Sequence, residues 1–358
     1  MAAILWHGVS KLQEERAGIN DLLGFLFVLA TLLTVSTSWV APARAAAVDP
    51  LEQIFGVGRR VSLPTSESML AAVPVKPQTR GSFTAPAPSE PHGCPQERSI
   101  FFRHHPKIVV SIPKYVVGDL NSFQVMLNRA WIYLPIMKEI LDMVGAPSDL
   151  LAVVFVESGF NGRVRSPAGA AGFWQLMPKT ARTLGLRVDA WVDERLDPIK
   201  ATRAAAVYLM DLYEQFGSWE LALAAYNAGD GAVRRAIRRH RSDDFWTLAK
   251  KRALPHQTRH FVPKVLAAVE VLRNFERYGL EKPSYEPVWT FTTVWVQRRL
   301  SLHQASVWTG VPLQDLRRLN PALRRDQIPA GKAYPLRLPP AAVKDFLLAY
   351  ERLINKKS

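Results

Sequence analysis

Between Ser148 and Pro255 the sequence is divided into short apolar segments by residues that begin and end helices. Serine, aspartate and proline are favoured at a helix start, and glycine is favoured just after a helix end. The starts are at Ser148, Pro178, Asp197-Pro198 and Ser218, and the stops are at Gly159, Gly217 and Gly229. Helical spacing continues to about Arg277, which predicts a main domain that is wholly or mostly α.

The regions on either side of this segment have different patterns. Eight prolines lie between Ala46 and Pro95, interleaved with small and polar residues, and this composition indicates a linker. Residues 108–112 form a short β-like run. After Pro283, residues 289–296 are typical of a strand, and two short helices and a closing strand at residues 334–338 complete a βααβ unit. We therefore predict four parts, at residues 1–45, 46–97, 98–283 and 284–345.

Residues 22–40 are uncharged and mostly apolar, and the small-x-small triplet Ala43-Arg44-Ala45 follows them. This arrangement is typical of an export signal with a peptidase site. A stretch of this length is also just able to span a bilayer, so a cleaved signal and an uncleaved membrane anchor both stay open. Cys94 lies far from the apolar stretch, and a lipoprotein signal is therefore not predicted.

Charge and cysteine content limit the classes of partner. The chain has 358 residues and a formal net charge of +15, which favours an anionic partner such as a nucleic acid, a membrane surface or an acidic polymer. The basic run at residues 234–241 is interpreted as a solvated helix face, and no nucleic-acid-binding motif accompanies it. Cys94 is the single cysteine, and the histidines have no metal-ligand spacing. We expect no metal, no cofactor and no nucleic acid.

A single carboxylate ends the apolar segment that follows Ser148. Glu157 comes after Leu-Leu-Ala-Val-Val-Phe-Val and directly before Ser158-Gly159. Apolar burial and the negative end of a helix dipole both disfavour ionisation, so we expect the pKa of Glu157 to be raised. A carboxyl group that stays protonated near neutral pH is suited to general acid catalysis. The alternative interpretation is a solvated carboxylate at a helix end.

Two further segments carry groups that suit a sugar ligand. Residues 166–178 form a loop rich in glycine and alanine that leads into Trp174-Gln175, and Tyr226-Asn227 ends a second apolar helix. Small residues allow close approach of a ligand, an indole offers a stacking face, and an amide both donates and accepts hydrogen bonds. Each motif alone is compatible with core packing. Their occurrence together within about seventy residues indicates a carbohydrate site.

In combination, these motifs resemble the lytic transglycosylases with a soluble-lytic-transglycosylase (SLT), goose-lysozyme-like domain, of the membrane-bound lytic murein transglycosylase D type. The resemblance covers residues 98–283 and implies a lysozyme-like helical fold there. It rests on Glu157-Ser158-Gly159-Phe160, on residues 169–175, on Val192-Asp193-Glu194-Arg195 with Asp197-Pro198, and on residues 225–229.

The resemblance implies that Glu157 is the single catalytic acid/base. The reaction would cleave the β-1,4 bond between N-acetylmuramic acid and N-acetylglucosamine in peptidoglycan without water, leaving 1,6-anhydro ends. The residues agree with this reaction, because ordinary glycosidases use a second carboxylate and the motifs contain none. Asp193 and Glu194 are expected in a separate capping loop.

The resemblance also assigns substrate-positioning residues, which are Ser158, Gln175, Tyr226 and Asn227. For Trp174, a core position and a sugar-facing position both stay open. One departure falls in the last helix, where the family usually carries Glu-Thr-x-x-Tyr-Val and this chain has Gln257 and, in place of the tyrosine, Phe261. The loss of that hydroxyl puts the hydrogen-bond network near the acid in doubt. For His260, a solvated side chain on a basic helix is the favoured interpretation, and a donor that replaces the lost hydroxyl is the alternative.

Residues 284–345 resemble a degenerate LysM module, an α+β unit whose family role is to hold polymers containing N-acetylglucosamine. The usual Gly-Asp-Thr is replaced by Arg299-Leu300-Ser301, so glycan binding and simple packing against the catalytic domain both stay open.

Together, these features predict an exported, mainly α protein of the periplasm or cell envelope that acts on peptidoglycan glycan strands. Association with the inner membrane is expected if the apolar segment at residues 22–40 is retained. Two alternatives remain for the function. One is a goose-type lysozyme that uses water, and the other is a peptidoglycan-binding scaffold without activity.

Overall fold

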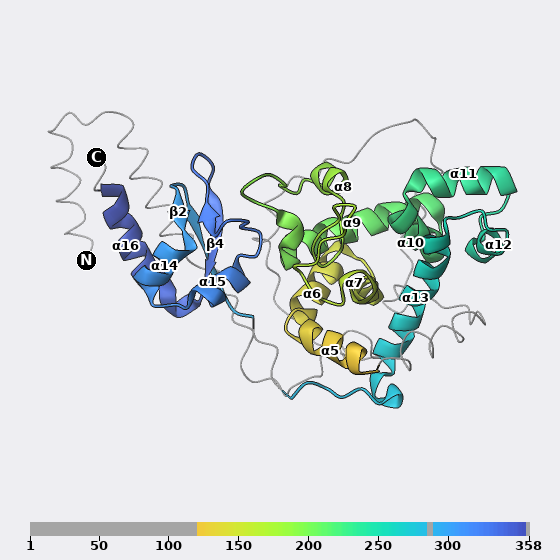
Figure 1. Ribbon diagram of the computed structural model, residues 1–358, viewed down its shortest axis with the longest axis horizontal. Coiled ribbons are helices and arrows are strands. Elements are labelled where there is room, and N and C mark those ends of the chain that lie inside the picture. Colours follow the sequence, from red (N-terminus) through yellow and green to blue (C-terminus); the bar gives the residue numbers. More distant parts are fainter. Residues whose placement is uncertain (1–119, 285–288, 356–358) are drawn as a thin grey trace, which may run out of the picture. The chain divides into compact units, whose positions relative to one another are not determined.

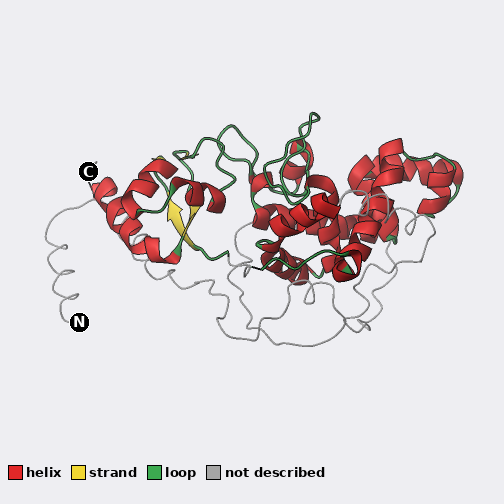
Figure 2. Cartoon of the chain, turned by 60° about the horizontal axis from the view of Figure 1, so that its bottom comes forward, coloured by secondary structure: helices red, strands yellow, loops and turns green. Residues whose placement is uncertain are grey.

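The computed structural model describes residues 120–284 and 289–355 (Figures 1 and 2). They form two compact units, one of residues 290–319 and 328–355 and the other of residues 120–284, 289 and 320–327. The predicted export segment at 1–45, the linker at 46–97 and the β-like run at 108–112 lie outside the described residues. Within the described residues, no helix has the length and apolar character needed to cross a membrane.

The larger unit is built from helices (Figure 2). They are α5 (Leu120–Trp131), α6 (Leu134–Val144), α7 (Leu151–Ser158), α8 (Pro178–Thr183), α9 (Pro198–Phe216), α10 (Trp219–Ala228), α11 (Asp230–His240), α12 (Phe245–Lys250) and α13 (His256–Arg273). Short 3-10 turns lie at Ser148–Leu150, Glu194–Leu196 and Phe275–Tyr278.

The helix boundaries follow the residues that predicted them. The side chain of Asp197 accepts hydrogen bonds from the first free N–H groups of α9, and that of Ser218 accepts one from the start of α10. Gly159 and Gly217 end α7 and α9 in the left-handed conformation, with φ of 55° and 65°. Ser148 departs from the prediction, because it opens a 3-10 turn and α7 begins only at Leu151.

Helices α7, α10 and α13 meet next to Glu157, which lies at the end of α7. α7 packs against α13, and α10 packs against both α9 and α13 (Figure 1). Residues 151–155 of α7 are all buried, since almost every side chain on this helix is apolar. An ion pair joins the start of this region to its end, because the guanidinium of Arg273 at the end of α13 donates to the buried Asp149 at 2.5 and 3.2 Å.

The smaller unit combines two short strand pairs with helices. Strands β1 (Thr292–Val296) and β4 (Tyr334–Leu338) pair antiparallel, with Val294 opposite Leu336. The remaining elements are β2 (Leu300–Ser301), α14 (Leu302–Thr309), α15 (Leu313–Leu319), β3 (Gln327–Ile328), a 3-10 turn at Pro340–Ala342 and α16 (Val343–Asn355). The predicted βααβ order is present, and the predicted fold class of a mainly α domain followed by a small α+β unit is confirmed.

Two details of the smaller unit differ from the prediction. The first strand begins at Thr292 rather than at residue 289, and α16 extends the unit beyond residue 345. α16 packs against α14 through Trp308 and Phe346, whose ring centroids are 5.8 Å apart. Ser301, which stands in the replaced Gly-Asp-Thr segment, is the N-cap of α14 and forms a capping box with Gln304.

Candidate active site

A cleft of about 830 Å³ opens where α7, α10 and α13 meet. Its lining residues are Val156 and Glu157 from α7, Asn227 from α10, and His256, Gln257, His260, Phe261 and Lys264 from α13. Glu157 is the one acidic side chain among these lining residues. The cleft therefore places the predicted carboxylic acid beside two amides, an aromatic ring and three basic side chains.

Glu157 is the second-to-last residue of α7, and the helix ends directly after Ser158 because Gly159 turns left-handed. The N–H of Gly159 donates to the carbonyl of Phe155 at 3.2 Å and closes the helix end. Burial raises the pKa of Glu157 to about 7, which confirms the predicted direction. The carboxyl group can therefore both donate and accept a proton near neutral pH.

Tyr226 lies close to this acid at the end of α10. Its hydroxyl donates a 2.6 Å hydrogen bond to the carbonyl oxygen of Trp174. Burial raises the pKa of Tyr226 well above its usual range, and the charges of Glu157 and Tyr208 raise it further. The phenol therefore stays protonated and connects α10 to the loop that contains Trp174.

Asn227 and Phe261 form two different walls of the cleft. The side-chain oxygen of Asn227 accepts a 2.8 Å hydrogen bond from the hydroxyl of Thr258, which is buried on α13. This bond fixes the orientation of the amide. The ring of Phe261 is buried and supplies an apolar wall, so at this position the chain offers no hydroxyl to the acid.

Three other predicted substrate contacts hold the loop at residues 166–177 and do not line the cleft. Trp174 is fully buried and its indole N–H donates to Thr202 at 2.9 Å, so its core position is the one found. The Ser158 hydroxyl donates to the carbonyl of Phe173 at 2.8 Å. The amide nitrogen of Gln175 donates to the carbonyls of Val164 and Gly172 at 3.1 and 2.8 Å. These side chains satisfy main-chain groups that the isolated β-bridges of the loop, at Arg165–Ala171 and Ala171–Leu176, leave without a partner in a strand.

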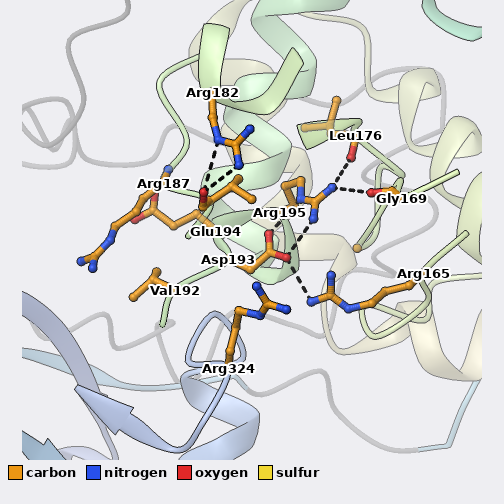
Figure 3. A network of polar contacts seen from close by, with 12 residues as sticks. Arg165, Gly169, Leu176, Arg182, Arg187, Val192, Asp193, Glu194, Arg195 and Arg324 are labelled. Atoms are coloured by element: carbon orange, nitrogen blue, oxygen red, sulfur yellow. Dashed lines mark hydrogen bonds and ion pairs between the residues drawn. The ribbon is translucent and has the colours of Figure 1, made fainter. Parts of the chain in front are cut away.

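The same loop is also held by the buried ion pair between Arg195 and Asp193 (Figure 3). The guanidinium of Arg195 donates to the carbonyls of Gly169 at 2.7 Å and Leu176 at 2.9 Å, and also to the carboxylate of Asp193. Arg165 donates to the same carboxylate at 3.0 Å. Burial alone would raise the pKa of Asp193, but the hydrogen bonds and charges of Arg195 and Arg165 hold it below its ordinary value. The Asp193 carboxylate is therefore ionised, and its role is structural, because it holds the two arginines that contact the loop.

The other carboxylate of this segment also has a structural partner. Glu194 accepts from the main-chain N–H of Arg187 at 2.7 Å and from the ammonium of Lys200 at 2.5 Å. Neither Asp193 nor Glu194 lines the cleft, in agreement with their predicted separation from the acid.

Sequence reasoning missed three basic residues of the cleft. His256, His260 and Lys264 all line it, and His260 is also exposed, as its interpretation as a solvated side chain predicts. Their spacing of four residues places them on one face of α13, and this periodicity is the signal from which they could have been found. Among the described residues, no group of three or more His, Cys, Asp or Glu side chains is arranged to hold a metal ion.

Two family models match the chain, one in the helical domain that carries Glu157 and one in the unit that follows it. Residues 137–249 match the model described as "Transglycosylase SLT domain", and residues 290–353 match "Lytic transglycosylase MltD, LysM-like domain". Both predicted domain types are confirmed. The SLT match ends before α13, so the basic residues of the cleft lie outside it.

The relatives that this chain matches are longer proteins. The chain is 33% identical over 190 residues to membrane-bound lytic murein transglycosylase D of Escherichia coli K12, covering 52% of this chain and 41% of that one. It is 35% identical over 132 residues to the soluble lytic murein transglycosylase of Salmonella typhimurium, covering 35% and 20%. The crystal structure of the 70 kDa soluble lytic transglycosylase of Escherichia coli aligns with a TM-score of 0.35 at 25% identity, covering 43% and 30%. The chain thus spans less than half the length of these relatives.

Proposed function

We propose that this protein is a lytic transglycosylase that cleaves the β-1,4 bond between N-acetylmuramic acid and N-acetylglucosamine in peptidoglycan, with Glu157 as its catalytic acid/base. The observation that carries the proposal is the cleft itself, whose lining contains one half-buried carboxyl group with a pKa of about 7 and no second acidic side chain. The two domain matches support the same reaction class.

In the first step, the protonated carboxyl of Glu157 donates its proton to the glycosidic oxygen. The bond between that oxygen and C1 of the muramoyl residue breaks, N-acetylglucosamine leaves with a free hydroxyl, and positive charge develops at C1. The raised pKa of Glu157 keeps the acid protonated before the bond breaks.

In the second step, the Glu157 carboxylate takes the proton of the muramoyl C6 hydroxyl. The C6 oxygen bonds to C1, a 1,6-anhydro ring forms, and the carboxyl is protonated again without consumption of water. This route suits a site with one carboxylate, because the two-carboxylate mechanisms of ordinary glycosidases need a partner on the other side of the bond. Asn227 would position the sugar beside the acid.

Other residues support this chemistry indirectly. Ser158, Gln175 and Tyr226 hold the loop and helix ends next to Glu157, and we assign them a positioning role rather than direct contact with sugar. Residues 290–353 would retain the glycan strand. We further propose that the protein works in the cell envelope, either released by cleavage after residue 45 or anchored to the inner membrane by residues 22–40.

Mass spectrometry of the soluble products tests this proposal. The full chain and its Glu157→Gln variant are incubated with isolated sacculi. Muropeptides with anhydro ends that are absent from the variant are the expected result. Products with reducing ends would identify a lysozyme instead, and sacculus binding without any product would identify a scaffold.

A further inference from the structure

A row of basic side chains runs along the α13 wall of the cleft. His256, His260 and Lys264 follow one another at intervals of four residues, so they share one face of the helix. The ring centroids of His256 and His260 are 4.5 Å apart. All three residues line the same cleft as Glu157. We call these three residues the basic row.

The basic row gives this cleft a particular charge balance. Its lining contains one ammonium group, that of Lys264, two imidazole rings that count as neutral in the formal charge, and one acidic side chain. That acidic group is Glu157, whose raised pKa reduces its negative charge at and below neutral pH. A cleft with this balance attracts an anion, and its histidine N–H groups and lysine ammonium are the donors that form charge-assisted hydrogen bonds with a carboxylate.

We propose that the basic row is a subsite for the free carboxylates of the stem peptides that are attached to the muramoyl residues. This inference rests on the proposed function and makes it more specific, because it names the form of substrate. The enzyme distinguishes glycan that carries peptides from bare glycan. The side chains that distinguish the two forms of glycan lie on α13, outside the residues that match the SLT family model.

The geometry of the lining residues favours a peptide over a second sugar at this position. Hexose rings are usually held by stacking on an exposed aromatic face together with neutral amides. The aromatic residue of this wall, Phe261, is buried, whereas His256 and His260 are exposed and Lys264 is half-buried. The wall therefore offers charge and N–H donors where a sugar platform would need an open ring.

A comparison of three substrates isolates the contribution of the stem-peptide carboxylates to binding. They are glycan strands with free stem peptides, the same strands with their peptide carboxylates amidated, and strands from which the peptides have been removed. For the wild-type full chain, we expect KM to be lowest on the strands with free carboxylates. The variants Lys264→Met and His260→Gln are expected to raise that KM by about five- to tenfold, the scale of one charge-assisted contact. The KM values on the other two substrates should change much less, so that the variants remove the preference among the three substrates.

A matched variant controls for the loss of net charge. Lys250→Met removes one positive charge from an exposed position on α12 that does not line the cleft, and it should leave the preference among the three substrates intact. The preference of the wild type should also shrink as ionic strength rises, because salt screens exposed charges.

Binding measured without turnover separates this inference from the proposed function. The Glu157→Gln variant, with and without Lys264→Met, is titrated with the three types of strand. A preference for free carboxylates that disappears with Lys264→Met supports the subsite even if the chain yields no anhydro product. Equal binding of all three strands, or an equal loss on all of them in the Lys264→Met variant, would overturn it.

Discussion

Arg195 and Asp193 form a doubly hydrogen-bonded ion pair that is buried, with Nε to Oδ1 at 2.8 Å and Nη2 to Oδ2 at 2.9 Å. The remaining donor of the guanidinium reaches two carbonyls of the loop at residues 166–177 (Figure 3). One planar cation therefore connects a buried anion to both ends of the loop that lies next to the acid. A lysine at this position has the charge but not the fork of donors.

Arg195→Lys is therefore expected to lower both stability and kcat. The buried carboxylate loses its bidentate partner and the loop carbonyls lose their donor, at a cost of about 3 kcal/mol. Arg165→Lys is the control, because Arg165 contacts the same carboxylate through one bond from a side chain that is 43% exposed. It should cost less than about 1 kcal/mol. Urea unfolding and the rate of anhydro product formation measure both effects, and equal losses for the two variants would contradict this role.

Gly172→Ala tests how closely the loop approaches this segment. A Cβ atom at Gly172 would lie 1.9 Å from the carbonyl oxygen of Arg195, and the residue has a φ of +82°. We expect a loss of about 3 kcal/mol or more, since main chain must move. Gly169→Ala has a similar φ of +91° but no atom within 4 Å of the added methyl group, so it should cost only about 1 kcal/mol. Thermal unfolding of both variants separates the steric effect from the effect of the dihedral angle.

On the proposed mechanism, the rate of anhydro product formation should fall as pH rises through about 7. The first step needs the protonated form of Glu157, and this form is lost above the pKa of about 7. Initial rates of anhydro product formation between pH 5 and 9 measure this fall in rate. A rate that stays constant across this range would exclude Glu157 as the titrating acid.

The same pKa predicts a pH-dependent effect on stability. Because the folded-state pKa of about 7 lies above the ordinary 4.5, the folded protein holds a proton that the unfolded chain has released between these values. Wild-type stability therefore falls as pH rises through this window. Glu157→Gln removes the effect, so the stability of this variant relative to the wild type should be near zero at pH 4 and about 3 kcal/mol above pH 7. Denaturant midpoints of the wild type and the Glu157→Gln variant at the two pH values show whether the variant is the more stable one only at the higher pH.

Thr258→Val should weaken catalysis through Asn227. The valine keeps the buried shape but removes the hydroxyl that donates to the side-chain oxygen of Asn227 at 2.8 Å. We expect kcat/KM to fall about tenfold, the scale of one lost hydrogen bond. Thr258→Ser keeps the hydroxyl and should retain most of the activity. A serine variant as impaired as the valine variant would show that the methyl group, and not the hydrogen bond, matters.

Much of the helical fold could be predicted because its boundaries are local. The residues that begin and end the helices contact main-chain groups only a few positions away, so the helix boundaries can be predicted from the sequence. They are Asp197, Ser218, Gly159 and Gly217. The raised pKa of Glu157 was predictable for the same reason, because seven apolar residues precede it. α16 was missed, although its buried Val343, Phe346 and Tyr350 recur at helical spacing in the sequence. Its partners are distant, because Phe346 packs against Trp308 of α14 and the Tyr350 hydroxyl accepts from the main chain at residues 297–298.

The direction in which polar side chains point could not be predicted. Ser158 and Gln175 bond to carbonyls of an irregular loop, and the path of that loop depends on Arg195, which is 19 residues from Leu176 and 26 from Gly169. Trp174 lies in the core because Thr202 on α9 accepts its N–H. Each of these outcomes requires the tertiary arrangement, which no local pattern contains.

The ion pair between Asp149 and Arg273 joins residues 124 positions apart. During synthesis, α7 leaves the ribosome long before α13, because chains emerge from the N-terminus. A nascent chain that has reached only α12 carries Glu157 without the wall of the cleft that α13 supplies. The burial that tunes the acid is therefore completed late in translation, and a polypeptide released before residue 256 would contain the carboxylate but not a cleft in which to use it.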